Sequence, residues 1–172
     1  MKVTVGIIAV ILVILGATVY STTKSSSEQP SKPVSQKVEA PKPTPPNTTE
    51  IFTLVNQERT KAGVKPLVID DRLNKSAQVK AQDMVSLNYY GHVNPTTKKH
   101  GYDIAHDYMQ ECVYTSENLN NGALSQGVDS ESTVSSWMNS KPHREAMLDT
   151  NYDYVGYAVS GDFIVMHLCD IQ

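Results

Sequence analysis

The sequence predicts an α+β protein, a three-layer α-β-α sandwich formed by residues 47–172. Segments with helical spacing of apolar residues come first, and two short β-type runs, residues 154–159 and 163–169, come last and are joined by a Ser-Gly-Asp turn. The final run is apolar on both faces apart from His167. A strand of that kind is buried from both sides, so helices are expected to cover both faces of the sheet.

The first two helices are predicted from their caps and from one apolar stripe each. Asn47, followed by Glu50, resembles a capping box, and apolar residues continue at helical spacing until Gly63 ends the helix. A second helix is expected over residues 70–88, where Asp70 caps the first turn. Its apolar stripe comprises Leu73, Ala77, Ala81, Met84 and Val85.

The middle of the domain carries weaker signals. Residues 91–121 have no sustained period, so they are expected to form mostly loop, with a short strand at residues 112–116. A third helix is predicted from about residue 130 to residue 138. Pro142 then starts a short turn that runs to Leu148, because proline ends one helical stretch and fits the beginning of the next.

Two further segments precede this domain. Residues 3–20 contain no charged side chain and are rich in Val, Ile and Leu, which predicts a membrane segment at residues 1–20. We expect an uncleaved transmembrane anchor; the alternative is a cleaved signal peptide, with secretion of the rest. Residues 21–46 hold six of the nine prolines and almost no large apolar side chain, which predicts a disordered linker. Either way, the domain is expected to be extracytoplasmic.

Charge and cysteine content narrow the possible partners. The chain has 15 basic and 18 acidic residues, a formal net charge of −3 at pH 7, and no basic run. Nucleic-acid binding is therefore not expected, because phosphate contacts require clustered Lys and Arg. Cys112 and Cys169 would be exported with the domain into an oxidising compartment, where we expect them to form a disulfide. The alternative is a pair of buried free thiols.

Three side chains suggest a metal site. His92 lies in Gly-His-Val-Asn-Pro, Glu117 in Ser-Glu-Asn-Leu and His143 in Lys-Pro-His-Arg. Two imidazoles and a carboxylate are a ligand set that zinc accepts, with a fourth position left for water. Their spacing is wider than that of a local zinc motif, so solvated or core histidines are the alternative. Of the other histidines, His100 and His106 are expected to be solvated. His167 is expected to be a hydrogen-bonded core or edge residue.

An ordered set of motifs resembles the CAP superfamily, especially its bacterial SCP-like extracellular domains. This superfamily also includes cysteine-rich secretory proteins and plant pathogenesis-related proteins. The motifs are LVNQER, AGVKPL, GHVNP, SENL and WMNSKPHREAML, followed by a VGYAV strand, and they extend from about residue 51 to the C-terminus. The resemblance implies the CAP fold, an α-β-α sandwich, with a cleft that in several members binds zinc or another divalent cation.

The resemblance also assigns cleft residues one by one. His92 matches the histidine of the family's G-H-x-x-P motif, Glu117 the glutamate of E-N-L, and His143 the second cleft histidine. Asn118 is expected to be a structural amide that holds the cleft loop. Ser140 stands where many eukaryotic members have a second glutamate, which we expect to weaken cation affinity or change the preferred metal.

Together these features predict a membrane-anchored extracytoplasmic CAP protein that binds a divalent cation, or a small or extended ligand, in a cleft of His92, Glu117, Asn118, Ser140 and His143. Its partner would be the cell envelope or an extracellular lipid, peptide or glycan. One alternative is a cell-wall or peptide hydrolase in which Ser140 acts with His143, although the sequence has no G-x-S-x-G or H-E-x-x-H motif. The other is a purely adhesive surface protein. A binding role is favoured over an enzymatic one.

Overall fold

The computed structural model describes residues 44–171. The predicted anchor, residues 1–20, and nearly all of the predicted linker, residues 21–46, lie outside these residues. In chain order the elements are α1 (Thr48–Lys61), β1 (Val68–Ile69), α2 (Asp71–Ser86), α3 (Gly101–Tyr108), β2 (Tyr114–Asn121), α4 (Ser130–Asn139), α5 (Lys141–Leu148), β3 (Tyr154–Ser160) and β4 (Phe163–Asp170). Of the helices in this part of the chain, none combines the length and the hydropathy that a membrane span requires.

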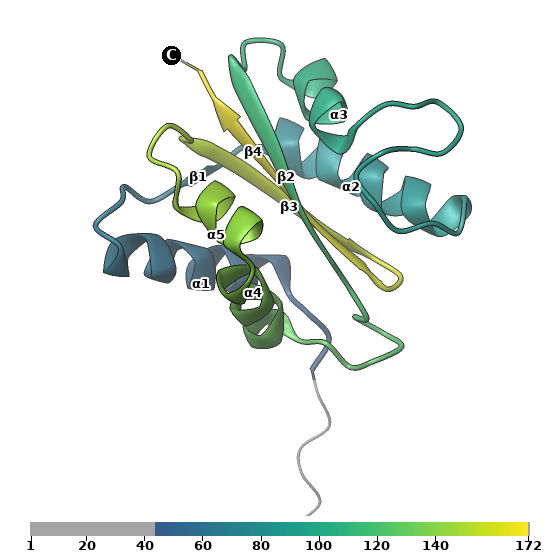
Figure 1. The fold of residues 1–172 in the computed structure, drawn as a ribbon, viewed down its shortest axis with the longest axis horizontal. Coiled ribbons are helices and arrows are strands. Elements are labelled where there is room, and N and C mark those ends of the chain that lie inside the picture. Colours follow the sequence, from purple (N-terminus) through teal and green to yellow (C-terminus); the bar gives the residue numbers. More distant parts are fainter. Residues whose placement is uncertain (1–43, 172) are drawn as a thin grey trace, which may run out of the picture. The chain divides into compact units, whose positions relative to one another are not determined.

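Four strands form one sheet in the order β1-β3-β4-β2 (Figure 1). β1 pairs parallel with the start of β3, whereas β4 pairs antiparallel with both β3 and β2. β4 therefore lies inside the sheet, and β2 is an edge strand. Helices α1, α4 and α5 cover one face, and α2 and α3 cover the other (Figure 1). The predicted three-layer α-β-α sandwich is confirmed for the described residues.

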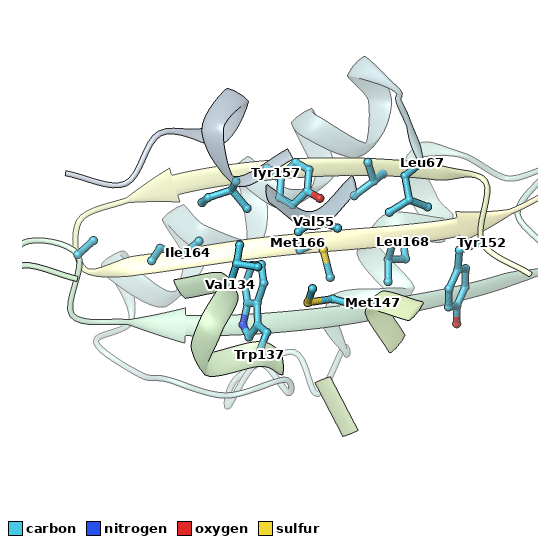
Figure 2. Close-up of a cluster of buried hydrophobic side chains, with 13 residues drawn as sticks. Val55, Leu67, Val134, Trp137, Met147, Tyr152, Tyr157, Ile164, Met166 and Leu168 are labelled. Carbon is cyan, nitrogen blue, oxygen red and sulfur yellow. The ribbon is translucent and has the colours of Figure 1, made fainter. Parts of the chain in front are cut away.

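The side chains of β4 alternate between two core layers. Ile164, Met166 and Leu168 face the layer of α1, α4 and α5 (Figure 2). Val165 and Cys169 face the other way and pack with buried residues of α2 and α3. Because successive side chains of a strand point to opposite faces, a strand covered on both sides is apolar at nearly every position.

Asn47 and Asp70 are the N-caps, as predicted. The capping box with Glu50 is not formed, because the backbone N–H of Asn47 donates to Oγ of Ser130 at 2.9 Å. The Asn47 side chain accepts a hydrogen bond from the backbone N–H of Thr49 at 2.8 Å, and Asp70 accepts one from Arg72 at 2.8 Å. α1 ends before Gly63, whose φ of +73° lies in the left-handed region that glycine adopts without strain. The first two helices therefore begin where their sequence signals predict.

The prediction for residues 91–121 is right that a strand begins near residue 114, but wrong that the rest is mostly loop. It expected mostly loop with a short strand at residues 112–116, but the structure has the helix α3 and the eight-residue strand β2. α3 buries only two small residues, too few to show a helical period in the sequence. β2 reads YTSENLNN, and its buried positions include Glu117 and Asn118. Polar residues at buried positions hide the alternation by which a strand is recognised.

The short turn predicted after Pro142 is helix α5. Ser140, with extended backbone, separates it from α4. Pro142 lies in the first turn, where proline fits because the first N–H groups of a helix have no partner within the helix. His143 follows directly, so it also lies in the first turn of α5.

Candidate functional site

The site is built around the edge strand β2. Glu117 and Asn118 are neighbours in this strand, so their side chains point to opposite faces of the sheet. Glu117 bonds to His92, in the loop between α2 and α3, and Asn118 bonds to His143 of α5. His92 and His143 therefore approach β2 from opposite faces of the sheet.

Glu117 is a buried carboxylate shared by two imidazoles. Its Oε1 lies 2.8 Å from Nδ1 of His92, and its Oε2 lies 3.0 Å from Nε2 of His167. Burial by itself would raise the pKa of this carboxyl, but hydrogen bonds from the two rings and the positive charge of Lys80 outweigh burial, so the pKa is lowered. The group is ionised at neutral pH and accepts a hydrogen bond from each ring.

The His92 side chain is half-exposed, and its hydrogen bond to Glu117 uses only Nδ1. Its Nδ1 donates to Glu117, whose side chain is 1% exposed, whereas the His92 side chain is 50% exposed. In metal sites, a histidine ligand usually donates its other ring N–H to a carboxylate or carbonyl in this way. His92 is therefore oriented for a ligand that approaches Nε2 from solvent.

Polar residues of α2 hold the loop that carries His92. The fully buried Lys80 donates from its ammonium group to the backbone carbonyls of Gly91 at 2.7 Å and His92 at 3.1 Å. Burial lowers the pKa of Lys80, and neighbouring carboxylates oppose this effect. Asp83, one turn further along α2, accepts a hydrogen bond from Asn94 at 2.6 Å. The G-H-V-N-P motif is thus fixed to α2 at three of its five residues.

His143 reaches the same edge from α5. The Asn118 side-chain amide donates to the His143 carbonyl at 3.0 Å, and Trp137 of α4 donates to the Leu119 carbonyl at 2.9 Å. Asn118 is thus a structural amide that fixes α5 to β2. The pKa of His143 is lowered, first by burial and then by repulsion from His92.

Three other predicted positions stand apart from these contacts. Ser140 is half-buried at the start of α5, and its hydroxyl makes no capping hydrogen bond. His106 is exposed on α3, as predicted. His100 is half-buried, unlike the solvated position expected for it, and its ring stacks on Tyr102 with the centroids 4.6 Å apart.

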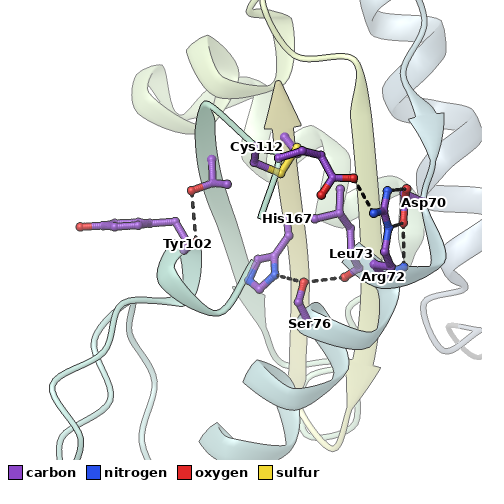
Figure 3. Close-up of a disulfide and its surroundings, with 10 residues drawn as sticks. Asp70, Arg72, Leu73, Ser76, Tyr102, Cys112 and His167 are labelled. Carbon is purple, nitrogen blue, oxygen red and sulfur yellow. Dashed lines mark hydrogen bonds and ion pairs between the residues drawn. A yellow bond between two sulfur atoms is a disulfide. The ribbon is translucent and has the colours of Figure 1, made fainter. Parts of the chain in front are cut away.

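His167 belongs to the site, although the sequence predicts only a hydrogen-bonded core or edge position for it. The prediction of a buried, hydrogen-bonded histidine is confirmed, but its contact with Glu117 was not foreseen. Its Nδ1 lies 2.8 Å from the hydroxyl of Ser76 on α2 (Figure 3). The antiparallel register pairs Glu117 with His167 across β2 and β4. The one sequence signal for this role was a titratable residue in an otherwise apolar strand.

The donor atoms at this edge suit two imidazole ligands better than the expected set of three. Within residues 44–171, no three His, Cys, Asp or Glu side chains form a group arranged to hold a metal ion. Both oxygens of Glu117 are bonded to imidazoles, whereas the ring of His92 is half-exposed. Two imidazoles completed by water or by a ligand's own atoms fit a transition-metal cation. Cation binding by His92, Glu117 and His143 stays a prediction.

The predicted disulfide is present. Cys112 and Cys169 are bonded, with their Cα atoms 5.5 Å apart, and both residues are buried. The bond joins the segment between α3 and β2 to the end of β4 (Figure 3). It therefore fixes the chain just before β2, the strand that carries Glu117 and Asn118.

Comparisons with known proteins agree with this architecture. The model of the cysteine-rich secretory protein family, CAP, matches residues 52–163. The uncharacterized protein YkwD of Bacillus subtilis (strain 168) is 38% identical over 114 residues, which cover 65% of this chain and 42% of YkwD. The chain therefore spans less than half the length of this relative.

Two solved structures share the fold. An extracellular protein of Bacillus anthracis str. Ames that contains an SCP domain superposes with a TM-score of 0.62 at 23% identity, covering 72% of this chain and 40% of that one. An outer surface protein of Borrelia burgdorferi superposes with a TM-score of 0.64 at 23% identity, covering 72% of this chain and 92% of that one. At these identities the likeness concerns the fold alone.

Proposed function

This chain belongs to the cysteine-rich secretory protein (CAP) family, and on that premise we propose that it is an extracytoplasmic protein that binds a divalent cation through His92 and His143. The observation that carries the proposal is the 2.8 Å hydrogen bond between Nδ1 of His92 and the buried Glu117, which leaves the half-exposed ring to bind through Nε2. A cation held there would attract an oxygen of a cell-envelope lipid, peptide or glycan as a further ligand.

The electrostatics of the site support a neutral imidazole at His143 as a donor. Burial and repulsion from His92 lower the pKa of His143, so its ring is neutral at neutral pH. The neutral ring is the form that binds a metal ion. Glu117 supplies one negative charge beside His92, and Ser140 adds no second one. This charge is smaller than that of family members with two glutamates.

Two observations support the extracytoplasmic location. The Cys112–Cys169 disulfide is of a kind that persists in oxidising compartments outside the cytoplasm. The similar structures from B. anthracis and B. burgdorferi are an extracellular and an outer surface protein, respectively. In this proposal residues 1–20 anchor the protein in the membrane, with secretion after signal cleavage as the alternative, and residues 21–46 act as a spacer.

Isothermal titration calorimetry of the full-length protein with zinc chloride at neutral pH tests the proposal. Wild-type protein should bind zinc, and the His92→Ala, His143→Ala double variant should lose at least about 100-fold in affinity, because removing ligands costs more than removing their supporting residues. The matched control is His106→Ala, which removes an exposed imidazole on α3 and should leave the affinity unchanged. Equal zinc affinity in wild type and double variant would refute cation binding at this site.

A further inference from the structure

Glu117 has no oxygen to offer a cation as long as His167 holds it. Oε1 lies 2.8 Å from Nδ1 of His92, and Oε2 lies 3.0 Å from Nε2 of His167. With both oxygens hydrogen-bonded and 1% of the side chain exposed, the carboxylate does not reach a cation that enters from solvent. Its contribution to a metal site is then to orient His92.

The surroundings hold this arrangement in place. A Cβ atom at Gly101 of α3 would overlap the Glu117 carboxyl group, so this helix packs directly on the carboxylate. The His167 ring is 0% exposed, and its Nδ1 lies 2.8 Å from Oγ of Ser76. Its cross-strand neighbour on β3 is Gly156, where a Cβ atom would overlap the α2 backbone at Leu73 and Asn74, so α2 packs directly on the sheet beside His167. Glu117 therefore cannot turn toward solvent without displacing one of these groups.

The identity of the free donor atoms decides which cations fit. Ca²⁺, Mg²⁺ and Mn²⁺ favour carboxylate, carbonyl and water oxygens, whereas Zn²⁺ and neighbouring late transition metals accept imidazole nitrogen readily. A site that includes the Glu117 carboxylate suits both groups of metals. A site restricted to His92 and His143 binds Zn²⁺ and its neighbours better than Ca²⁺, Mg²⁺ or Mn²⁺.

We propose that His167 sets the metal preference of this site: by holding Oε2 of Glu117, it keeps the carboxylate bonded to His92 and out of the coordination sphere. The protein then takes Zn²⁺ in preference to Mn²⁺. This inference rests on the proposed function, since it specifies which cation His92 and His143 bind. His167 is a positioning residue, because it acts through Glu117 and does not touch the cation.

Two substitutions of similar polarity separate the contacts of His167. In His167→Gln, the side-chain amide is long enough to place an N–H near the position of Nε2, so it keeps the hydrogen bond to Glu117. In His167→Asn, the shorter amide reaches the position of Nδ1 and keeps only the contact with Ser76. The pair therefore differs in whether Oε2 of Glu117 has a donor.

Calorimetric titration of the full-length proteins with zinc chloride and with manganese chloride compares the two variants. Wild type and His167→Gln should prefer Zn²⁺ by the same ratio. His167→Asn should bind Zn²⁺ about tenfold more weakly and Mn²⁺ more tightly, because Oε2 becomes free to coordinate. Equal ratios in the two variants, or a wild type that binds Mn²⁺ as tightly as Zn²⁺, would overturn the inference. A wild type that binds no zinc would instead refute the proposed function itself.

A second comparison does not depend on the folding of His167 variants. If Glu117 only orients His92, Glu117→Gln should keep zinc binding with an affinity about tenfold lower, whereas His92→Ala should lose far more. An equal loss in these two variants would identify Glu117 as a ligand and overturn the inference. Circular dichroism of each variant verifies that the affinity is measured on folded protein.

Discussion

A single buried carboxylate organises the site. The pKa of Glu117 is lowered although burial opposes its ionised form, because His167 and His92 donate hydrogen bonds to it and Lys80 lies nearby. Glycine at position 101 leaves room for this carboxylate, since any side chain there would overlap the Glu117 carboxyl group. The polar residues at buried positions of β2 are therefore explained by the site, in which they have hydrogen-bond partners, and not by core packing.

Replacing this carboxylate should destabilise the fold in a pH-dependent way. We expect Glu117→Gln to lower the free energy of unfolding by about 1–3 kcal/mol at neutral pH, because an amide cannot accept hydrogen bonds from both imidazoles as a carboxylate does. The folded-state pKa of Glu117 lies below its ordinary value of 4.5. The stability that ionisation adds is therefore fully present above that pH and is lost as the pH falls through the folded-state pKa.

Urea unfolding of wild type and Glu117→Gln, followed from neutral pH down to about pH 3, measures this effect. The difference in unfolding free energy between the two proteins should shrink at the acid end of the range. A difference that stays constant, or that grows as the pH falls, is incompatible with an ionised Glu117 in the folded state.

At the level of helices and strands, one guanidinium group joins α1 to the end of α5. Arg59 is fully buried, and burial is the main effect that lowers its pKa. It donates to four backbone carbonyls at 2.8 to 3.1 Å: those of Lys65, Met147, Asp149 and Tyr152. These carbonyls lie after α1, in the last turn of α5, and between α5 and β3. The position of α5, and with it that of His143, thus depends on a residue of α1.

We expect Arg59→Met to lower the free energy of unfolding by at least about 3 kcal/mol, because it leaves four carbonyls without their donor. The control on the same helix is Lys61→Met, which breaks an exposed ion pair with Glu58 and should cost less than about 1 kcal/mol. Urea unfolding measures both values. If the two substitutions cost the same, Arg59 does not have this structural role.

Across the whole domain, the site lies where both helical layers meet the same edge of the sheet. The loop after α2 brings His92 from one layer and α5 brings His143 from the other, while β2 supplies Glu117 and Asn118 between them. The disulfide ties the chain just before β2 to the interior strand β4. The disulfide that stabilises the whole sandwich therefore also fixes the position of β2, the strand that carries Glu117 and Asn118.

Loss of the disulfide should destabilise the domain by about 2–4 kcal/mol, because a cross-link restricts the unfolded chain. Here the bond joins residues separated by 57 positions. Urea unfolding with and without a reductant measures the effect. In the Cys112→Ala, Cys169→Ala variant, the reductant should leave the free energy of unfolding unchanged. A shift of equal size in that variant would show that the reductant acts elsewhere.

The sequence by itself determined the fold class, the first two helix starts and the disulfide. Caps at Asn47 and Asp70 act within one turn, and a strand that is apolar on both faces requires cover on both faces, so a short stretch of sequence reveals each feature. α3 and β2 had no such signal. Their buried positions are few, small or polar, and polar residues are stable there only because of partners elsewhere in the chain.

Only the tertiary structure decided what surrounds Glu117. The family resemblance brought His92, Glu117 and His143 into one site, but the contact with His167 follows from the antiparallel register of β2 and β4. That register pairs residues 50 positions apart, and it depends on the packing of the whole sheet, so no local pattern encodes it. For this reason the sequence predicted Glu117 as a metal ligand, whereas in the folded protein both of its oxygens are bonded to imidazoles.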